Sequence, residues 1–504
     1  MSTDASPAAR PRLSRSTLSA LAAGVARPDY DVGAVRTGIV HLGLGAFHRA
    51  HQAVYTDGLL AHDPRWGICG VSLKTPRSTA ALAAQDGLYC VAAKGEGTIE
   101  LRVVGSLREA LFLGDDRDRV IARIADPAVS VVTLTVTEKG YCHDPATGRL
   151  DRGHPDIVHD LAHPDAPVSA IGVLVAGLAA RRAASGAPVN VVSCDNLPHN
   201  GRTAEGIVSS FAQARDGALA AWIAAHVAFP CTMVDRIVPA VRPADIEEVA
   251  RLAGVDDAVP VVAEPYRCWV IENRFVAERP AWEDAGAQIV DDVAPFETMK
   301  LRLLNASHST LAYLGYLAGH DTIWQASNDP QLAALIRRMM DTEIVPTLVA
   351  PPGIDLHAYC AELVARFRNP TLPHRTQQIA MDGSQKIPPR LLSTARARIA
   401  RGASFDHVAL AVAGWIRYAS GVDEHGAPIR VDDPMAAEFA AIATQASGDP
   451  ARLARGFLDL AAVFGADLSG NAAFRETVTR DVATLVRDGV HRTLEAHNAL
   501  SSAD

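Results

Sequence analysis

The residues best suited to chemistry lie between Phe296 and His308, where a lysine, an asparagine and a histidine interrupt an apolar, helix-like run. At about 100° per residue, Asn305 lies roughly 140° and His308 roughly 80° around the axis from Lys300, so all three can face one wide cleft. Desolvation disfavours the charged form of a lysine among leucines, so Lys300 could exchange a proton near neutral pH. Asn305 could polarise a carbonyl oxygen, and His308 could hold a hydroxyl group.

Spacing alone favours a plainer interpretation of the same three residues. The lysine stem can extend to solvent, and the asparagine and histidine can be satisfied by structural hydrogen bonds. The rest of the chain must therefore decide whether this stretch carries a reaction.

The composition limits the kind of protein. A chain of 504 residues exceeds the usual size of one hydrophobic core, which predicts two domains. The net charge of -9, with lysines and arginines scattered along the chain, argues against nucleic acid or an anionic membrane as partner. Seven separate cysteines without a C-x-x-C pair predict neither a zinc ribbon nor a disulfide framework, and indicate a reducing cytoplasm. The oligomeric state stays open between a monomer and a small homo-oligomer.

The N-terminus and the apolar runs carry no targeting or membrane signal. Residues 1–30 are interpreted as an N-terminal extension, a frayed end followed by one short helix. The best apolar run, Ala170 to Ala180, is shorter than the ~20 residues of a membrane span and is followed by Arg181.

A glycine-rich turn follows the first predicted strand. Thr37 to Leu42 is typical of a buried strand, and the residues from Gly43 to Leu60 make a turn and then a helix. Strand, glycine turn and helix are the context of a dinucleotide fingerprint, with Gly43 in the tight turn and Gly45 allowing a pyrophosphate to approach. The third glycine is absent. The candidate cofactor-binding residues of the turn are Gly43, Gly45, Ala46, Phe47 and His48, although a G-x-G turn can also simply join a strand to a helix.

The second predicted strand, Trp66 to Leu73, should end near the adenosine ribose, where an acidic residue is usual. The loop that follows, Lys74 to Ser78, contains no acid. Arg77 could instead accept a 2′-phosphate, so the expected cofactor is NAD with NADP possible. The alternative is that Arg77 is an ordinary surface charge.

Further strands end in polar residues. Val129 to Thr137 leads into Glu138 and Lys139, and Val189 to Ser193 leads into Asn196. Helical stretches at Ala170–Ala183 and Thr203–Ala225 separate them, which predicts a largely parallel sheet whose carboxyl ends bind the ligand. Met233 to Ile237, with Asp235, and Val261 to Pro265 are predicted as additional strands. Residues 31–294 are thus interpreted as an α/β, Rossmann-type nicotinamide dinucleotide-binding domain.

From about Pro295 the pattern changes to long amphipathic helices with few strand signals, which predicts a mostly α-helical C-terminal domain over residues 295–504. Its most distinctive loop runs from His374 to Pro388. Arg375 there could bind a carboxylate in a bidentate manner, although the loop could equally be a solvated helix end.

These segments together resemble the mannitol dehydrogenase family of polyol-specific long-chain dehydrogenases. The resemblance spans about Thr37 to Gly489 and rests on five segments: Gly43–Gln52, Thr137–Tyr141, Ser193–Asn196, Met233–Arg236 and Lys300–His308. It implies a substrate cleft between two domains and no catalytic metal. It also implies that Lys300 is the general acid/base, that Asn196 and Asn305 hold the reacting oxygen, that Glu138 relays the proton, and that Asp235, His308 and Lys386 position hydroxyl groups.

Two departures from the mannitol-oxidising members favour the fructuronate reductase branch of this family. Lys139 stands where those members typically carry a glycine, and Gln378 stands where they carry a basic residue. A uronate has a carboxylate that a polyol lacks, and Arg375 with Lys139 or Lys386 could pair with it. The expected reaction is therefore hydride transfer between NAD(P) and a hexuronate, interconverting fructuronate and mannonate. The alternatives are the same chemistry on mannitol and fructose, or a catalytically silent dinucleotide sensor.

Overall fold

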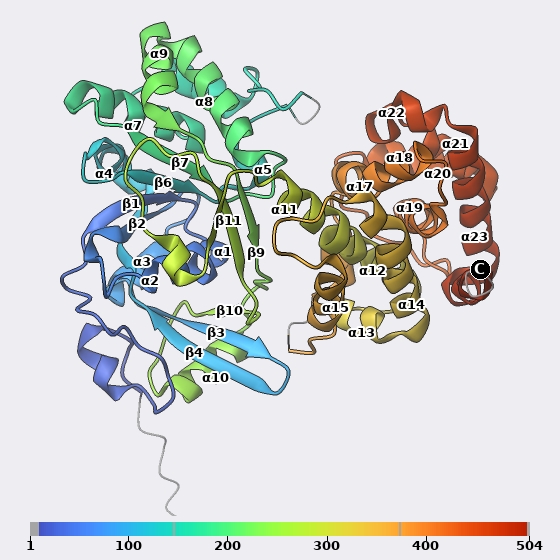
Figure 1. Ribbon diagram of the computed structural model, residues 1–504, viewed down its shortest axis with the longest axis horizontal. Coiled ribbons are helices and arrows are strands. Elements are labelled where there is room, and N and C mark those ends of the chain that lie inside the picture. The colour runs from blue at the N-terminus through green and yellow to red at the C-terminus, as the bar shows by residue number, and fades with distance from the viewer. Residues whose placement is uncertain (1–9, 145–146, 372–373, 501–504) are drawn as a thin grey trace, which may run out of the picture. The chain divides into compact units, whose positions relative to one another are not determined.

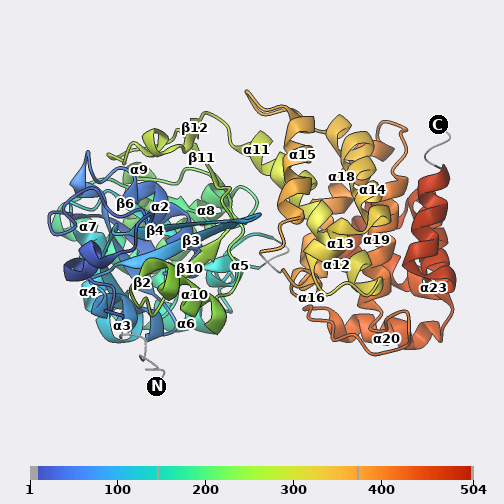
Figure 2. The same ribbon diagram turned by 90° about the horizontal axis from the view of Figure 1, so that it is seen from below.

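The computed structural model describes residues 10–144, 147–371 and 374–500. The chain divides into two compact units, Met1–Ala294 and Pro295–Asp504, and Figures 1 and 2 show the strands gathered in the first and the helices of the second. Within the described residues, no helix is both long and apolar enough to cross a membrane.

A six-stranded parallel sheet forms the centre of the first unit. Its spatial order is β5 (Leu107–Phe112), β2 (Gly67–Ser72), β1 (Thr37–Leu42), β6 (Val131–Leu134), β7 (Val189–Ser193) and β8 (Val227–Ala228). The inner strands are almost wholly buried because apolar residues pack on both faces, as expected of a parallel sheet. The chain order reverses direction beside β1, and such a switch point leaves a crevice at the carboxyl ends of the strands.

Helices and two small sheets cover this central sheet. One apolar core joins it to α4 (Leu113–Ala125), α7 (Ala170–Ala184), α8 (Asn200–Arg215) and α9 (Gly217–His226). A second core contains α1 (Ala46–Ala50), α2 (Gln52–Asp57) and the buried Trp269 and Trp282. The small sheets have the orders β10 (Val261–Ala263), β3 (Tyr89–Gly95), β4 (Thr98–Val104), and β12 (Gln288–Val290), β11 (Cys268–Glu272), β9 (Thr232–Asp235). The remaining helices are α3 (Arg77–Ala84), α5 (Thr137–Gly140), α6 (Pro155–Ala162) and α10 (Pro243–Ala253).

Three predicted elements of this unit differ from the structure. The strand predicted to reach Thr137 ends at Leu134, because Thr137 has a positive φ of 64° and opens α5. The helix predicted over Thr203–Ala225 is two helices, because Asp216 caps the second by accepting a bond from the amide of Ala218. The short helix predicted near the N-terminus is a 3₁₀ helix, Arg15–Ala20, and nearby Leu13 is fully buried.

The second unit is a helical assembly around one large apolar core. Trp415 lies within it, with its ring 5.6 Å from that of Phe457 and 5.7 Å from that of Phe439. The helices are α11 (Ala294–Met299), α12 (Ala306–Leu317), α13 (Ile323–Asn328), α14 (Pro330–Arg338), α15 (Leu356–Phe367), α16 (Thr376–Ile379), α17 (Gly383–Ile387), α18 (Ser393–Ile399), α19 (Asp406–Ala419), α20 (Ala436–Ala446), α21 (Pro450–Leu458), α22 (Ala461–Ser469) and α23 (Ala472–Leu500). Three π-helical segments interrupt them: η4 (Lys300–Asn305), η5 (Met339–Ile344) and η7 (Pro388–Leu392).

Candidate active site

The turn after β1 uses its two glycines differently. Gly43 has a φ of 104°, and a Cβ there would lie 2.1 Å from the carbonyl oxygen of Thr135, so the protein's own backbone excludes a side chain. Gly45 is exposed with an extended backbone, and a Cβ there would meet nothing closer than 3.7 Å. The fold therefore requires a glycine at Gly43 but not at Gly45. The open space at Gly45 fits a residue that a pyrophosphate approaches closely.

His48, at the position of the missing third glycine, is buried beneath the turn. Its ring stacks on that of His41 with centroids 3.3 Å apart, and His41 in turn bonds the carbonyl of Gly43 and the hydroxyl of Thr133. Desolvation lowers the pKa of His41 to about 3 and that of His48 well below its usual range, so both rings are neutral at physiological pH. The side chain of His48 thus packs on the ring that bonds the Gly43 carbonyl, and its direct contact with a cofactor remains a prediction.

The other predicted cofactor residues are accessible. Ala46 and Phe47 are half-buried at the start of α1. Arg77 is exposed as the first residue of α3, shortly after the carboxyl end of β2, where the sequence places the adenosine ribose. The fingerprint residues are therefore at the edge of the sheet where a dinucleotide would be held.

A buried carboxylate fixes the segment that carries Glu138 and Lys139. Asp195 follows β7 and accepts bonds from the amides of Val136 and Thr137, at 3.0 and 2.9 Å, and from the hydroxyl of Tyr141 at 2.9 Å. These bonds hold α5 and the left-handed Thr137 at the end of β6. Desolvation raises the pKa of Asp195 to about 6, although its three donors favour the charged form. Glu138 and Lys139 are exposed on this one-turn helix.

Asn196, the residue after Asp195, is exposed at the carboxyl end of β7. Asn200 secures that loop, because its buried amide donates to the carbonyls of Ser193, Asp195 and Thr232 and accepts from the amide of Thr232. The same bonds tie β7 to β9, at whose end Asp235 is buried. Neither Asp195 nor Asn200 was among the residues predicted for the site. The sequence signal for both is their position just after a buried strand, with Asp195 directly before Asn196 and Asn200 four residues after it.

In the second unit, the stretch that carries Lys300 and Asn305 is a π-helix. The prediction of a regular α-helical period here is wrong. A π-helix bonds residue i to residue i+5, so Lys300 and Asn305 lie about one turn apart, closer to the same side than an α-helix would place them. Lys300 is 8 % exposed and Asn305 is half-buried. Helical segments of this kind recur at functional sites.

Arg390 stabilises this π-helical segment from η7. Its guanidinium donates to the carbonyl oxygen of Asn305 at 3.4 Å and to the hydroxyl of Ser309 at 2.9 Å. A π turn displaces carbonyl groups from the regular ladder, and a fixed arginine satisfies one of them. Local sequence patterns do not predict this contact, because Arg390 lies 85 residues from Asn305.

His308, three residues into α12, lies in a positively charged environment. Its ring stacks near those of Phe367 and His374, with centroids 5.4 and 5.6 Å away. Burial holds the pKa of His308 well below its usual range, and the charges of His374, Arg390, Lys386 and Arg366 act in the same direction. Within the described residues its Nε2 atom has no hydrogen-bond partner. A buried neutral imidazole with an unsatisfied nitrogen is suited to a ligand hydroxyl.

The loop after residue 373 places a second ring near His308 and leaves Arg375 at the surface. The ring of His374 stacks near that of His308, and Arg375 is exposed as the N-cap of α16, so its contact with a carboxylate remains a prediction. Lys386 is half-buried on α17 and donates to the carbonyl of Ile379 at 3.4 Å. Asp433 anchors that helix by accepting bonds from the amide and hydroxyl of Ser384, at 2.8 and 2.6 Å.

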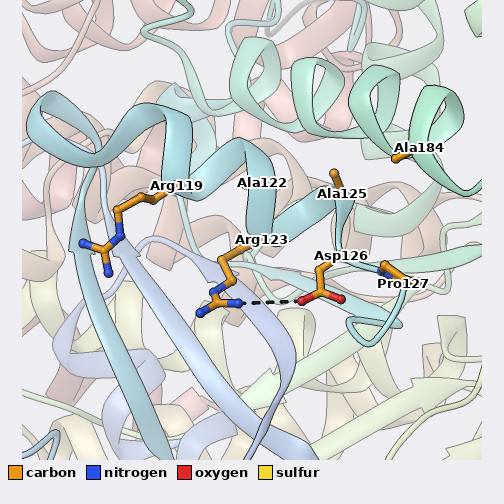
Figure 3. Close-up of a pocket in the computed structure, with 7 residues that line it drawn as sticks. All are labelled: Arg119, Ala122, Arg123, Ala125, Asp126, Pro127 and Ala184. Atoms are coloured by element: carbon orange, nitrogen blue, oxygen red, sulfur yellow. Dashed lines mark ion pairs between the residues drawn. The ribbon is translucent and has the colours of Figure 1, made fainter.

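A pocket of about 510 Å³ opens elsewhere on the first unit (Figure 3). Its lining consists of Arg119, Ala122, Arg123, Ala125, Asp126, Pro127 and Ala184. Four of these residues lie on α4, Asp126 and Pro127 lie between α4 and β6, and Ala184 ends α7. Both helices lead into the amino ends of strands, so the pocket lies at that edge of the sheet, opposite the Gly43 turn. Arg123 already pairs with Glu109 at 2.6 Å and with Asp126 at 3.7 Å. The pocket is therefore separate from the predicted site.

Two family models match the chain, and they agree with its division into a Rossmann-type unit and a helical unit. The mannitol dehydrogenase Rossmann domain matches residues 37–284, and the mannitol dehydrogenase C-terminal domain matches residues 292–486. The chain belongs to the mannitol dehydrogenase family and is an oxidoreductase.

Proteins with named reactions match the chain over more than nine-tenths of its length. The chain is 49 % identical to the D-mannonate oxidoreductase of Escherichia coli over 94 % of its own length and 98 % of the relative's. It is 40 % identical to the mannitol 2-dehydrogenase of Pyricularia oryzae, over 93 % and 94 %. A solved Pseudomonas fluorescens mannitol 2-dehydrogenase, in a ternary complex with NAD and D-mannitol, is similar with a TM-score of 0.88 and 40 % identity, covering 96 % of this chain and 99 % of that one.

Proposed function

We propose that this oxidoreductase uses NAD to interconvert D-fructuronate and D-mannonate, with D-fructuronate, NADH and a proton giving D-mannonate and NAD⁺. The observation that carries the substrate assignment is the 49 % identity to the D-mannonate oxidoreductase of Escherichia coli, over 94 % of this chain. The charges of Arg366, Lys386 and Arg390 act on the ring of His308, and such a positive environment suits a substrate that carries a carboxylate.

The proposed roles follow from the chemistry of each side chain. Bound NADH supplies the hydride. Lys300 donates the proton to the carbonyl oxygen during reduction and removes it during oxidation. Asn305, one π turn from Lys300, donates an amide hydrogen bond to the same oxygen, and Asn196 is proposed for the same task. Glu138 exchanges the proton with solvent, for which its exposed position on α5 is suitable.

The remaining proposed contacts concern the sugar acid. His308 accepts or donates a hydroxyl hydrogen bond through its unsatisfied Nε2 atom, and Asp235 and Lys386 position further hydroxyl groups. Arg366 is proposed as the carboxylate partner, in addition to Arg375, Lys139 and Lys386, which the sequence suggested. A cytoplasmic location remains a prediction from the scattered cysteines.

The second candidate is the interconversion of D-mannitol and D-fructose, which the Pyricularia oryzae and Pseudomonas fluorescens relatives favour. A steady-state comparison with NADH and each ketose decides between them. We expect kcat/KM for fructuronate to exceed that for fructose by at least about tenfold, the effect of one charge-assisted contact. Comparable or faster turnover of fructose would assign the protein to polyols. Tight NADH binding without hydride transfer to either ketose would favour the dinucleotide sensor.

The carboxylate assignment has a sharper test in paired arginine variants. Arg366→Ala should lower kcat/KM for fructuronate by about 10- to 100-fold, since a lost charge-assisted bond costs about 1.5–3 kcal/mol, while fructose turnover changes little. Arg375→Ala, which removes the exposed alternative partner, is measured in parallel. A selective loss of fructuronate activity in Arg375→Ala alone would return the carboxylate to the residue that the sequence suggested. Equal losses for both ketoses in Arg366→Ala would give Arg366 a structural role.

A further inference from the structure

Three potential metal ligands meet in the first unit, away from any role proposed above. Cys142, His154 and Asp156 each offer one ligand atom, and these atoms all lie within 4.8 Å of one another. A thiolate, an imidazole and a carboxylate are the ligand types that Zn²⁺ and related thiophilic cations bind in proteins.

The fold brings these residues together through a hairpin. Cys142 directly follows α5 and Tyr141, and its carbonyl accepts a bond from the amide of Asp151 at 2.9 Å. An antiparallel bridge joins His143 to Leu150, and the chain then turns into α6. His154, the N-cap of α6, and Asp156 in its first turn therefore lie beside Cys142, although they follow it by a dozen or more positions in the chain.

The backbone at Cys142 is held in an unusual conformation. Its φ is 49°, in the left-handed region that cysteine rarely adopts, and the residue is 5 % exposed. Non-glycine residues in this region concentrate at functional and ligand-holding positions. The carboxylates of Asp156, Asp160 and Asp151 act electrostatically on the thiol, and Lys74 acts in the opposite direction, so three negative groups and one positive group face a cation placed there.

Helix capping explains only part of this cluster. The Nδ1 atom of His154 accepts a bond from the amide of Asp156, and an acidic residue in the first turn of α6 complements the helix dipole. That bond is long, 3.3 Å, and a metal on Nδ1 would replace it. Capping gives no reason for a buried cysteine beside these two groups.

We propose that Cys142, His154 and Asp156 bind one Zn²⁺-like divalent cation at a non-catalytic site. Zinc bonds of 2.0–2.3 Å in tetrahedral geometry place neighbouring ligand atoms about 3.5 Å apart, which side-chain rotation within this cluster can reach. Water completes the tetrahedron, and the thiol proton passes to solvent as the metal–sulfur bond forms. Because Cys142 lies four residues after Glu138, the cation fixes the segment that carries Glu138 to the start of α6.

The test uses Co²⁺ as a spectroscopic probe on the full-length protein after treatment with a chelator. We expect one Co²⁺ per chain, with the charge-transfer absorption of a cobalt–thiolate bond, and displacement by Zn²⁺. Cys142→Ser should abolish that absorption, and His154→Ala and Asp156→Asn should each weaken Co²⁺ binding at least tenfold. Cys268→Ser, at the half-buried cysteine, is the matched control and should bind like the wild type.

Two results would overturn the proposal: no stoichiometric charge-transfer absorption in the wild type, or the same absorption in Cys142→Ser. Asp156 is exposed, so Asp156→Asn should fold normally and keeps the test decisive if substitution of the buried cysteine prevents folding. The readout is metal binding and not turnover, so its failure would leave the proposed reaction untouched.

Discussion

Replacing Asp195 by asparagine should change how the stability of the protein depends on pH. The pKa of Asp195 is raised from 3.8 to about 6 in the folded protein, so the folded state holds this proton more tightly than the unfolded chain does. The contribution of this bound proton to the free energy of unfolding is fully present below pH 3.8, and it is lost as the pH rises through 6. A difference of about two pKa units corresponds to about 3 kcal/mol.

A comparison of the wild type with Asp195→Asn isolates the contribution of this one ionisation to stability. Between pH 4 and pH 7, the free energy of unfolding of the wild type should fall by about 2 kcal/mol relative to that of Asp195→Asn, because the amide does not ionise and the effect has already begun at pH 4. At pH 4 the variant should be the less stable protein by about 1–3 kcal/mol. An asparagine cannot accept the bonds at both carboxylate oxygens, and one amide of Val136 or Thr137 loses its partner.

Urea unfolding of both proteins, followed by circular dichroism at pH 4 and pH 7, measures the difference. Asp118→Asn, at an exposed aspartate of α4, is the matched control and should follow the wild type. Parallel pH dependence of the wild type and Asp195→Asn would refute the raised pKa of the buried Asp195. The same variant loosens α5, so kcat should fall about tenfold or more while cofactor binding is retained. An unchanged kcat would mean that Asp195 does not position Glu138.

Three further predictions concern Lys300, which we propose as the acid/base, and the binding of the cofactor. Lys300→Ala should lower turnover by at least about two orders of magnitude while NADH binding, followed by fluorescence titration, stays nearly intact; a loss below tenfold would exclude Lys300 as the acid/base. Gly43→Ala should destabilise the first unit severely, because its Cβ would overlap the Thr135 carbonyl, whereas Gly45→Ala should change the free energy of unfolding by less than about 0.5 kcal/mol and raise KM for NADH. Equal thermal stability of the two glycine variants would contradict this difference. If Arg77 binds a 2′-phosphate, NADPH should compete with NADH and Arg77→Ala should weaken NADPH selectively; a strong preference of the wild type for NADH would make Arg77 a surface charge.

Local sequence patterns determined the element types and their order. The strands Thr37–Leu42 and Val189–Ser193 and the helix Leu356–Phe367 have the predicted bounds, because buried apolar runs and amphipathic periods mark them directly. The family could also be predicted from the sequence, because each of its motifs is a short contiguous segment. The strands β3, β4 and β5 were not predicted, because their pattern mixes charged with apolar residues in a partly exposed hairpin and sheet edge.

The supporting residues of the site could not be read from local patterns. Asp195 satisfies amides almost 60 positions earlier in the chain, and Arg390 contacts Asn305 across 85 positions. Long-range hydrogen bonds of this kind depend on where buried donors are left unsatisfied, which only the folded chain specifies.

The stretch around Lys300 shows most clearly what the sequence determines and what the tertiary structure decides. Its sequence determined which groups are available, namely one lysine, one asparagine and one histidine among apolar residues. The tertiary structure decided their geometry, because packing against η7 and the bond from Arg390 accompany a π-helix where the apolar pattern predicted an α-helix. It also surrounded His308 with arginines and a lysine from other segments. The intrinsic period of a helix is local, but the choice between two close helical forms depends on tertiary contacts that the sequence pattern does not encode.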